Sequence, residues 1–414
     1  MRALVAIVPL LVGEAWASSE PIINQQVKRS FYLNTAVIRE ELSIVVFYDP
    51  THSAAGSHKE VHNYRLVIPP KVAEHFASGT ATYESMDLPL QETTGLKDTG
   101  ACLPIGSRCF SLNLPRPLSA SNPKAIFGIG LSYTNMLQAR PSFGSALDPN
   151  QVFFSSSPYF FSPYPTLKQK ASIIMAREVT AVRIKCPTPN HLESSPVANM
   201  PNAMEYNCGV YNSIDSLHNK EDILSVQFTA PRLPLFHFEN LERRIRVDLL
   251  RKVLVVEDNY VLFHDGHRPK EGWFNKAEYV QRMMRQQEPG QILAVIPMIV
   301  PAMASEVQVR DEVGLLTGNV QRRPAPSAPK AFHLLEIQPR NVLAGGWNLS
   351  WKLSYTLPLA VYLEKTANGL RLVLSLFELY HDVSIDRLSL SVTLPVGVSL
   401  AGVSVSKNFE VVKF

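Results

Sequence analysis

Few residues in this chain have the types and spacing that catalysis needs. His264, Asp265 and His267 place two imidazoles and a carboxylate within four positions, a combination that suits a metal ion. Asp265-Gly266 is also a turn signal between strands, and no second cluster with zinc-ligand spacing appears in the sequence. We therefore interpret this stretch as a turn, and we predict neither a metal site nor a bound cofactor.

Adjacent carboxylates at Asp311 and Glu312 have the chemistry of a general acid and base. They lie in a short charged stretch between apolar runs, which is typical of a solvated turn. The sequence contains no Gly-x-Ser-x-Gly nucleophile elbow and no glycine-rich phosphate loop. We assign no catalytic residue and predict that the chain is not an enzyme. The alternative is a hydrolase that uses His264, Asp265 or this carboxylate pair, and it rests on residue types alone.

The segment Tyr159–Lys170, YFFSPYPTLKQK, combines aromatic rings with prolines. Pro163 and Pro165 exclude a helix interior and interrupt a β-ladder, so we predict a rigid, extended connector. Its rings belong to Tyr159, Phe160, Phe161 and Tyr164. They either close one edge of a sandwich core or form an exposed surface for a sugar or a partner protein.

The N-terminus predicts export from the cytosol. Arg2 is followed by a short apolar run and by an A-x-A site at Ala15–Ala17, the pattern of a secretory signal peptide over residues 1–17. Four cysteines in an exported chain allow two disulfides, and the pairing that closes short loops joins Cys102 to Cys109 and Cys186 to Cys208. Asn348 begins the triplet Asn-Leu-Ser, one candidate N-glycosylation acceptor.

The elements that must position these residues are mainly strands. Short β-rich runs such as Glu41–Tyr48 and Leu349–Leu357 recur along the chain, each ending near Gly, Pro, Asp or Asn. One helix is predicted over Lys276–Gln287 with Asn275 as its cap, and a shorter one over Lys71–Phe76. The pattern predicts an all-β chain of β-sandwich-like domains with one or two short helices.

The 414 residues have room for two such domains. We place the first at residues 18–235 and the second at residues 236–414, because a new series of strands begins after Phe236. Residues 187–220 are rich in Pro, Asn and Ser and are predicted to form a long loop inserted in the first domain. The apolar run Ile292–Ala304 is too short, and too interrupted by prolines, to span a bilayer, so we predict a buried strand.

Charge gives little support to a nucleic-acid partner. The formal net charge is only +4, and the basic residues are spread along the chain.

Six segments in fixed order carry a resemblance to a known family. They are Ile23–Leu33, Tyr159–Gln169, Phe274–Arg282, Val309–Gly314, Ile337–Leu363 and Leu379–Val398. Together they resemble ribophorin I, a non-catalytic subunit of the endoplasmic-reticulum oligosaccharyltransferase. The most specific segment contains Gly345-Gly346-Trp347, where two glycines permit backbone angles closed to other residues just before a large ring.

The resemblance implies two tandem lumenal β-sandwich-like domains, then a membrane-spanning helix. It also implies a structural role in the complex that transfers an oligosaccharide to Asn of N-x-S/T, with the chemistry in another, multi-spanning subunit. The expected partners are that subunit, the other subunits and the endoplasmic-reticulum membrane. The family pattern continues past the position of Phe414, so we expect the second domain to be incomplete at its C-terminus.

The same resemblance gives the aromatic segment a role as a structural loop or a subunit contact. The alternative to the subunit hypothesis is a secreted β-sandwich module that binds a glycan or protein and has no catalytic role.

Overall fold

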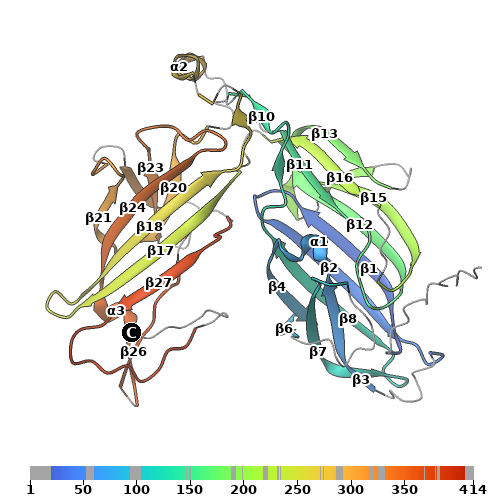
Figure 1. Cartoon of the computed structure of the whole chain (residues 1–414). Helices are drawn as coiled ribbons and strands as arrows, with labels where there is room; N and C mark the ends of the chain where they lie inside the picture. The colour runs from blue at the N-terminus through green and yellow to red at the C-terminus, as the bar shows by residue number, and fades with distance from the viewer. Residues whose placement is uncertain are drawn as a thin grey trace, which may run out of the picture. The chain divides into compact units, whose positions relative to one another are not determined.

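The structure, a computed structural model, describes residues 20–405 except for 53–59, 94–103, 146, 149–150, 188–192, 198, 218–221, 231–232, 234, 271, 274, 286–291, 317–319, 325–331, 368, 378 and 380–382. The predicted signal peptide and Cys102 therefore lie outside the described residues. Within them the chain is mainly β-strand with three short helices (Figure 1), which confirms the prediction of an all-β protein. No helix in this described part is long and apolar enough to cross a bilayer.

The chain divides into two compact units. The first contains Met1–Arg140 and Gln151–Leu233, and the second contains Pro141–Asn150 and Pro234–Phe414. The sequence analysis placed residues 141–150 in the first domain. In the structure β10 (Phe143–Gly144) from this segment pairs in parallel with β19 (Arg268–Pro269), so the segment folds with the second unit.

An eight-stranded sheet forms the larger layer of the first unit, in the order β14-β15-β12-β1-β2-β8-β4-β5. Only the central pair β1 and β12 runs parallel among these neighbours. The strands are β1 (Ile22–Tyr32), β2 (Ile38–Tyr48), β4 (Phe76–Tyr83), β5 (Met86–Leu88), β8 (Lys124–Tyr133), β12 (Thr166–Ala176), β14 (Glu193–Val197) and β15 (Met200–Ile214).

Two smaller sheets complete the first unit. One has the order β3-β7-β6 and the other β13-β16-β11-β9. Their strands are β3 (Glu60–Ile68), β6 (Leu90–Glu92), β7 (Arg108–Ser119), β9 (Gln138–Ala139), β11 (Gln151–Ser156), β13 (Thr180–Lys185) and β16 (Leu224–Thr229). The helix α1 (Pro70–Ala73) is shorter than predicted, since β4 already begins at Phe76.

Rings join these layers across the core of the first unit. Phe127 of the large sheet contacts Tyr64 of β3 at 4.7 Å between ring centroids, and Phe31 contacts Phe154 of β11 at 5.3 Å. All four side chains are buried, as the inward positions of alternating strands should be.

The predicted loop over residues 187–220 is wrong. β14 and the 15-residue β15 occupy most of this range, and β15 pairs along its length with β12. Asn and Pro have low strand propensity, but pairing with a central strand and burial of Ala203, Cys208 and Tyr211 outweigh that local preference.

The second unit is a sandwich of a five-stranded and a three-stranded sheet, in the orders β21-β24-β18-β17-β27 and β20-β23-β22. β17 and β27 run parallel. The strands are β17 (Phe236–Asp248), β18 (Val253–His264), β20 (Ile296–Pro301), β21 (Ser305–Arg310), β22 (Val320–Pro324), β23 (Phe332–Ile337), β24 (Asn348–Pro358) and β27 (Leu388–Thr393), with a separate hairpin of β25 (Leu363–Thr366) and β26 (Gly369–Leu372).

One core cluster lies between these two sheets. It combines Leu262 and Leu353 of the larger sheet with Met298 and Leu335 of the smaller one. β20 is the buried strand predicted within Ile292–Ala304, and it lies at the edge of its sheet, where prolines are tolerated.

Two helices belong to the second unit. α2 (Lys276–Met284) begins as predicted, with the Asn275 side chain accepting hydrogen bonds from the backbone N–H groups of Ala277 and Glu278. The short α3 (Leu359–Tyr362) follows β24 and was missed in the sequence.

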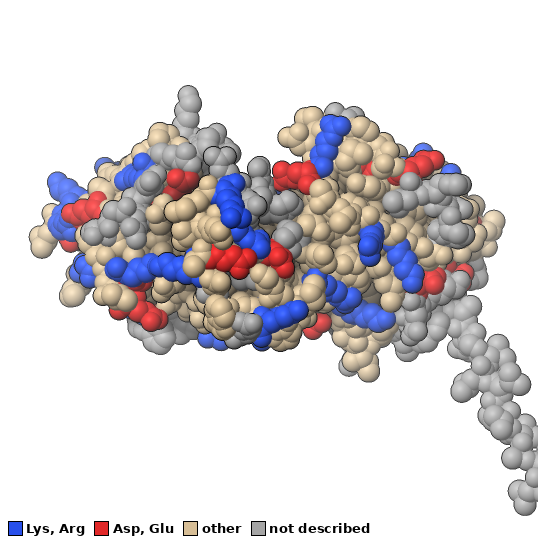
Figure 2. Space-filling model, turned by 90° about the horizontal axis from the view of Figure 1, so that it is seen from above, with Lys and Arg blue, Asp and Glu red and all other residues tan. Residues whose placement is uncertain are grey.

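Charged side chains of both signs mix on the surface. On the face shown in Figure 2, Lys and Arg side chains lie among Asp and Glu side chains instead of forming one basic patch. This distribution gives no electrostatic footprint of nucleic-acid binding on that face.

Candidate functional site

The aromatic segment Tyr159–Lys170 has no regular secondary structure up to Pro165, and its last five residues, Thr166–Lys170, form the start of β12. Phe160 and Tyr164 are 4% and 1% exposed, whereas Tyr159 and Phe161 are half-buried. The Tyr164 ring packs on Tyr64 of β3, with ring centroids 5.0 Å apart. Two of the four rings thus belong to the core of the first unit and are not available to stack on a sugar.

A buried polar network fixes the second half of the segment. Asn24 of β1 donates to the hydroxyl oxygens of Ser162 (3.0 Å) and Thr166 (3.1 Å). Its carbonyl oxygen accepts from the hydroxyl of Tyr64 (3.1 Å), and Ser162 also accepts from the backbone N–H of Tyr164 (3.1 Å). Paired in this way, polar groups in the core stabilise one loop conformation.

Two further side chains fix the first half. Gln169 of β12 accepts from the backbone N–H of Phe160 (2.8 Å) and donates to the carbonyl of Pro158 (2.7 Å). Arg29 of β1 donates to the carbonyl oxygens of Ser157 (2.8 Å) and Tyr159 (2.7 Å). The backbone of a loop without internal ladder bonds is therefore satisfied by side chains from the sheet.

Arg29 is at the same time one half of a buried ion pair. Its Nε donates to Oε1 of Glu40 on β2 at 2.5 Å, and the two side chains are only 9% and 3% exposed. Its guanidinium group lies 4.5 Å from the ring centroid of Phe31. The pair connects the sheet to the aromatic segment through one side chain.

The half-buried ring of Tyr159 lies at the rim of this region. Its hydroxyl donates to Asp222 (2.8 Å), and its ring packs edge-on against Tyr211 of β15. Burial, and then the bond to the Asp222 carboxylate, raise the pKa of Tyr159 to about 12. Tyr159 is thus a neutral hydrogen-bond donor at neutral pH. Whether Tyr159 and Phe161 contact another subunit stays a prediction.

The side chains of His264, Asp265 and His267, in the predicted turn, each have a different partner in the structure. The Nδ1 atom of His264 accepts from the backbone N–H of Gly266 (2.9 Å), whereas His267 donates from Nε2 to the carbonyl of Ser145 (2.5 Å). Asp265 instead pairs with His237. No group of three or more His, Cys, Asp or Glu side chains that would hold a metal ion occurs in the described part of the chain.

His237 of β17 lies between two carboxylates. Its Nδ1 is 2.8 Å from Oδ2 of Asp265, and its Nε2 is 3.4 Å from Oδ2 of Asp386 in the stretch before β27. The hydrogen bond to Asp265, with smaller contributions from the charges of Asp265, Asp386 and Glu239, raises the pKa of His237 despite its burial.

This geometry makes the stability of the second unit depend on pH. The contribution of His237 is fully present below its unfolded pKa, about 6.5, and is lost as pH rises through the higher folded pKa. We expect the stability difference between wild type and His237→Gln to be larger at about pH 6 than at about pH 8.5, because the contribution of the imidazolium is lost as pH rises through the raised folded pKa. Denaturant unfolding followed by tryptophan fluorescence measures it, and a difference that stayed constant or grew with pH would contradict the assignment.

Asp311 and Glu312 form a structured corner. Asp311 accepts from the backbone N–H groups of Val313 and Gly314, and its other oxygen accepts from Nε of Arg340 at 2.6 Å. Burial acts to raise the pKa of Asp311, but these hydrogen bonds outweigh it and the pKa is lowered. Glu312 accepts from the hydroxyl of Ser350. Both side chains thus have structural partners: Asp311 within its turn and at Arg340, and Glu312 at Ser350 of β24.

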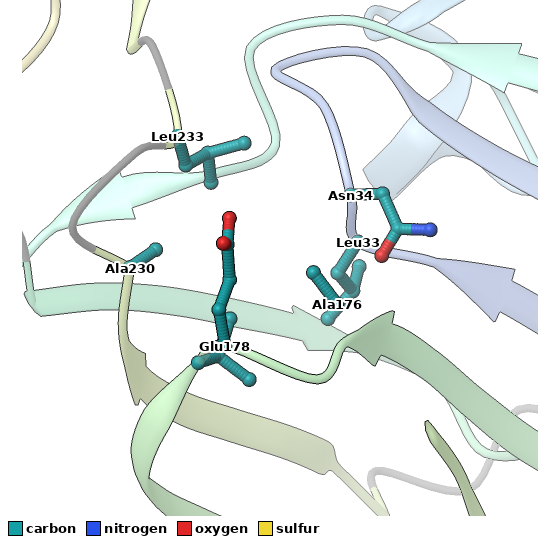
Figure 3. A pocket seen from close by; sticks show the side chains of 7 residues that line it. Leu33, Asn34, Ala176, Glu178, Ala230 and Leu233 are labelled. Carbon is teal, nitrogen blue, oxygen red and sulfur yellow. The ribbon is translucent and has the colours of Figure 1, made fainter. Parts of the chain in front are cut away.

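A small pocket lies in the first unit (Figure 3). Its lining residues are Leu33, Asn34, Ala176, Glu178, Val179, Ala230 and Leu233. Its volume of about 40 Å³ holds a few water molecules but is far below the several hundred Å³ of a small-molecule site.

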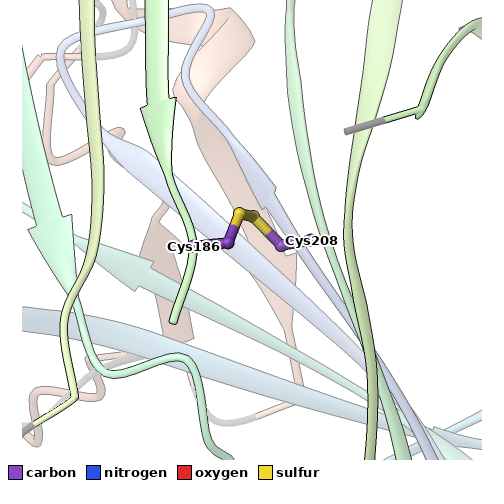
Figure 4. Close-up of a disulfide and its surroundings, with 2 residues drawn as sticks. All are labelled: Cys186 and Cys208. Carbon is purple, nitrogen blue, oxygen red and sulfur yellow. A yellow bond between two sulfur atoms is a disulfide. The ribbon is translucent and has the colours of Figure 1, made fainter. Parts of the chain in front are cut away.

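The cysteines and Asn348 have defined positions. A disulfide joins Cys186, directly after β13, to Cys208 on β15, with Cα atoms 5.8 Å apart (Figure 4), so it links the four-stranded sheet to the eight-stranded one. Cys109 on β7 carries a free thiol, and its predicted partner Cys102 lies outside the described residues. Asn348 is exposed at the start of β24. Its glycosylation stays a prediction.

The Gly-Gly-Trp stretch packs against the turn after β18. The N–H of Gly346 donates to the carbonyl of His264 (2.7 Å), and the N–H of His264 donates to the carbonyl of Trp347 (3.0 Å). Gly346 has φ +76°, in the left-handed region. A Cβ on Gly345 would collide with the carbonyl oxygen of His267 and lie 2.7 Å from the backbone of Gly266. Gly345 is thus required by a close approach of two backbone segments, and Gly346 by its left-handed backbone conformation.

Comparison with known protein families supports the resemblance found in the sequence. The family model of ribophorin I matches residues 22–413, nearly the whole chain. The chain belongs to the ribophorin I family. Two of the segments that carry the resemblance can be placed in the structure. The first forms most of β1, and the Gly-Gly-Trp stretch lies directly before β24.

The curated proteins that are similar to this chain are named as subunits of a glycosyltransferase. Dolichyl-diphosphooligosaccharide–protein glycosyltransferase subunit 1B of Oryza sativa is 28% identical over 304 residues, which is 72% of this chain and 58% of that protein. Subunit 1 of Caenorhabditis elegans is 26% identical and covers 69% of this chain and 45% of that protein. The chain spans about half the length of these relatives.

Among solved structures, an M1 zinc metallopeptidase from Deinococcus radiodurans is similar to 67% of this chain and 58% of its own chain, with 10% identity and a TM-score of 0.30. That likeness is too weak to carry an argument about fold or activity.

Proposed function

We propose that this ribophorin I family member is a non-catalytic structural subunit of the endoplasmic-reticulum oligosaccharyltransferase. In this role it supports co-translational N-glycosylation at Asn of N-x-S/T, and another, multi-spanning subunit carries the chemistry. The observation that supports the proposal is the family match over residues 22–413, together with relatives that are named as subunit 1 of this glycosyltransferase.

The physical character of the chain is compatible with a scaffold. Its conspicuous polar residues hold backbone segments: Arg29, Asn24 and Gln169 fix the aromatic segment, and Asp311 fixes a corner. The disulfide between Cys186 and Cys208 suits the oxidising lumen, so we propose that both units lie on the lumenal side of the membrane. We further propose that the half-buried rings of Tyr159 and Phe161 belong to a contact with a neighbouring subunit.

Co-purification tests the proposal directly. The protein is immunoprecipitated from digitonin-solubilised membranes, and its partners are identified by mass spectrometry. We expect recovery of the catalytic subunit together with other oligosaccharyltransferase subunits, and under-glycosylated reporter glycoproteins when the protein is depleted. Recovery of the protein alone, with reporter glycosylation unchanged on depletion, would exclude the structural-subunit role.

A further inference from the structure

The helix α2 exposes apolar side chains that the fold leaves uncovered. Met284 is 80% exposed, Met283 48% and Val280 39%, and Trp273 just before the helix is 57% exposed. No residue of α2 is buried. Exposed apolar residues are common singly, but four large ones within twelve positions form a patch that needs an explanation.

Contacts fix which side of α2 faces the protein. Nη1 of Arg282 donates to the carbonyl of Leu147 at 2.6 Å, and Tyr279 packs against the small cluster of Leu147, Ile292 and Ala344. Successive helix residues advance by about 100°, so Val280 and Met284 lie on the side opposite Arg282. The second unit thus holds the helix by its polar side and turns its apolar side outward.

Exposed basic side chains lie at and before the start of α2 and at its end. Lys270, Lys276 and Arg285 are exposed, while the acidic Glu278 pairs with Arg282 on the protein-facing side. Residues 268–288 contain five basic and three acidic residues, a local net charge of 5 − 3 = +2. An apolar stripe with a tryptophan and a basic border is the chemistry of a helix that lies in the interface of a membrane.

We propose that α2, with Trp273, is a membrane-surface contact that docks onto a bilayer containing anionic lipids. The apolar side chains enter the boundary between head groups and acyl chains, and Lys270, Lys276 and Arg285 meet the negative head groups. With only nine residues, the helix provides a weak, reversible contact that orients the second unit on a membrane. This inference rests on the geometry of α2 and is independent of the proposed subunit role.

Vesicle flotation tests the proposal with the full chain. Purified wild-type protein is mixed with vesicles of phosphatidylcholine and phosphatidylserine at a ratio of about 7:3, and with phosphatidylcholine vesicles alone. The test variant carries Val280→Glu, Met283→Glu and Met284→Glu. The control carries Leu250→Glu and Val313→Glu, two side chains of the same unit that lie outside α2 and are 98% and 80% exposed. The wild type and all variants have the same N-terminal residues, so any contribution of this apolar segment to vesicle binding cancels when the variants are compared.

We expect the wild type and the control to float with the anionic vesicles and the α2 variant to remain at the bottom. A second variant, Lys276→Glu with Arg285→Glu, keeps the apolar stripe and should bind the anionic vesicles about tenfold more weakly or worse, because each basic residue near an anionic surface contributes roughly five-fold. Unchanged flotation of the α2 variant, or an equal loss in the control, overturns the proposal. Unchanged flotation combined with loss of a co-purifying protein would instead assign the patch to a protein partner.

Discussion

Arg29→Met is expected to lower the free energy of unfolding of the first unit by about 3–5 kcal/mol, because it leaves the Glu40 carboxylate charged and buried without its partner. The same change removes the Nη1 group that donates to the carbonyl oxygens of Ser157 and Tyr159. We therefore expect the aromatic segment to open before the unit unfolds globally. Hydrogen exchange read by mass spectrometry would show faster exchange in peptides from residues 157–170 than in peptides from β8.

Two companion variants separate the causes of this loss. Lys28→Met changes the neighbouring residue on β1, whose amino group is 4.0 Å from Glu205 and whose side chain is 53% exposed, so it should alter stability by less than about 1 kcal/mol. Adding Glu40→Gln to Arg29→Met removes the orphaned charge and should restore part of the stability but not the protection of residues 157–170. Equal effects of Lys28→Met and Arg29→Met, or full protection of the segment in Arg29→Met, would show that the ion pair does not hold the loop.

The importance of Arg29 was missed in the sequence, although a signal was present. Val27, Arg29 and Phe31 share one face of β1, and Ile38, Glu40 and Leu42 share one face of β2. Charges of opposite sign at apolar positions of two neighbouring strands indicate a buried pair. This signal can be recognised only if the two strands are known to be adjacent. The alternation of apolar and polar residues along each strand does not show that.

The second unit also has a buried ion pair between two adjacent strands of its larger sheet. Arg243 on β17 and Asp258 on β18 stand opposite each other in register and form two hydrogen bonds of 2.8 Å, with side chains 3% and 1% exposed. The Asp258 carboxylate also accepts from the hydroxyl of Tyr260. In the described part of the chain, the larger sheet of each unit thus contains a strongly buried ion pair, which favours the correct strand register at a cost in desolvation.

The sequence was sufficient where local chemistry decides the structure. The Asn275 cap fixed the start of α2, and strand alternation predicted the all-β class. It failed for β15, whose polar composition resembles a loop, because its pairing with β12 and β14 and the burial of part of its side chains make it a strand. It also failed for residues 141–150, whose membership in the second unit depends on contacts with residues more than a hundred positions away, such as His267 and Arg282.

Gly345→Ala is expected to destabilise the second unit by about 3 kcal/mol or more, since a methyl group has no room against the backbone of Gly266 and His267. Neither side can move freely, because the hydrogen bonds between His264, Gly346 and Trp347 hold the two segments together. A shift would also disturb the contact of His267 with Ser145. The loss should therefore reach beyond the turn, into the anchoring of residues 141–150.

Tryptophan fluorescence during guanidinium unfolding measures this effect selectively, since Trp273, Trp347 and Trp351 all belong to the second unit and the remaining Trp16 lies in the predicted signal peptide. The control is Gly402→Ala, at a glycine with nothing within 4 Å of an added Cβ, where a change below about 0.5 kcal/mol is expected. If both variants unfolded at the wild-type midpoint, the close backbone approach would not be a constraint on residue 345. A selective loss in Gly345→Ala would show that the close approach of the two backbone segments requires glycine at position 345.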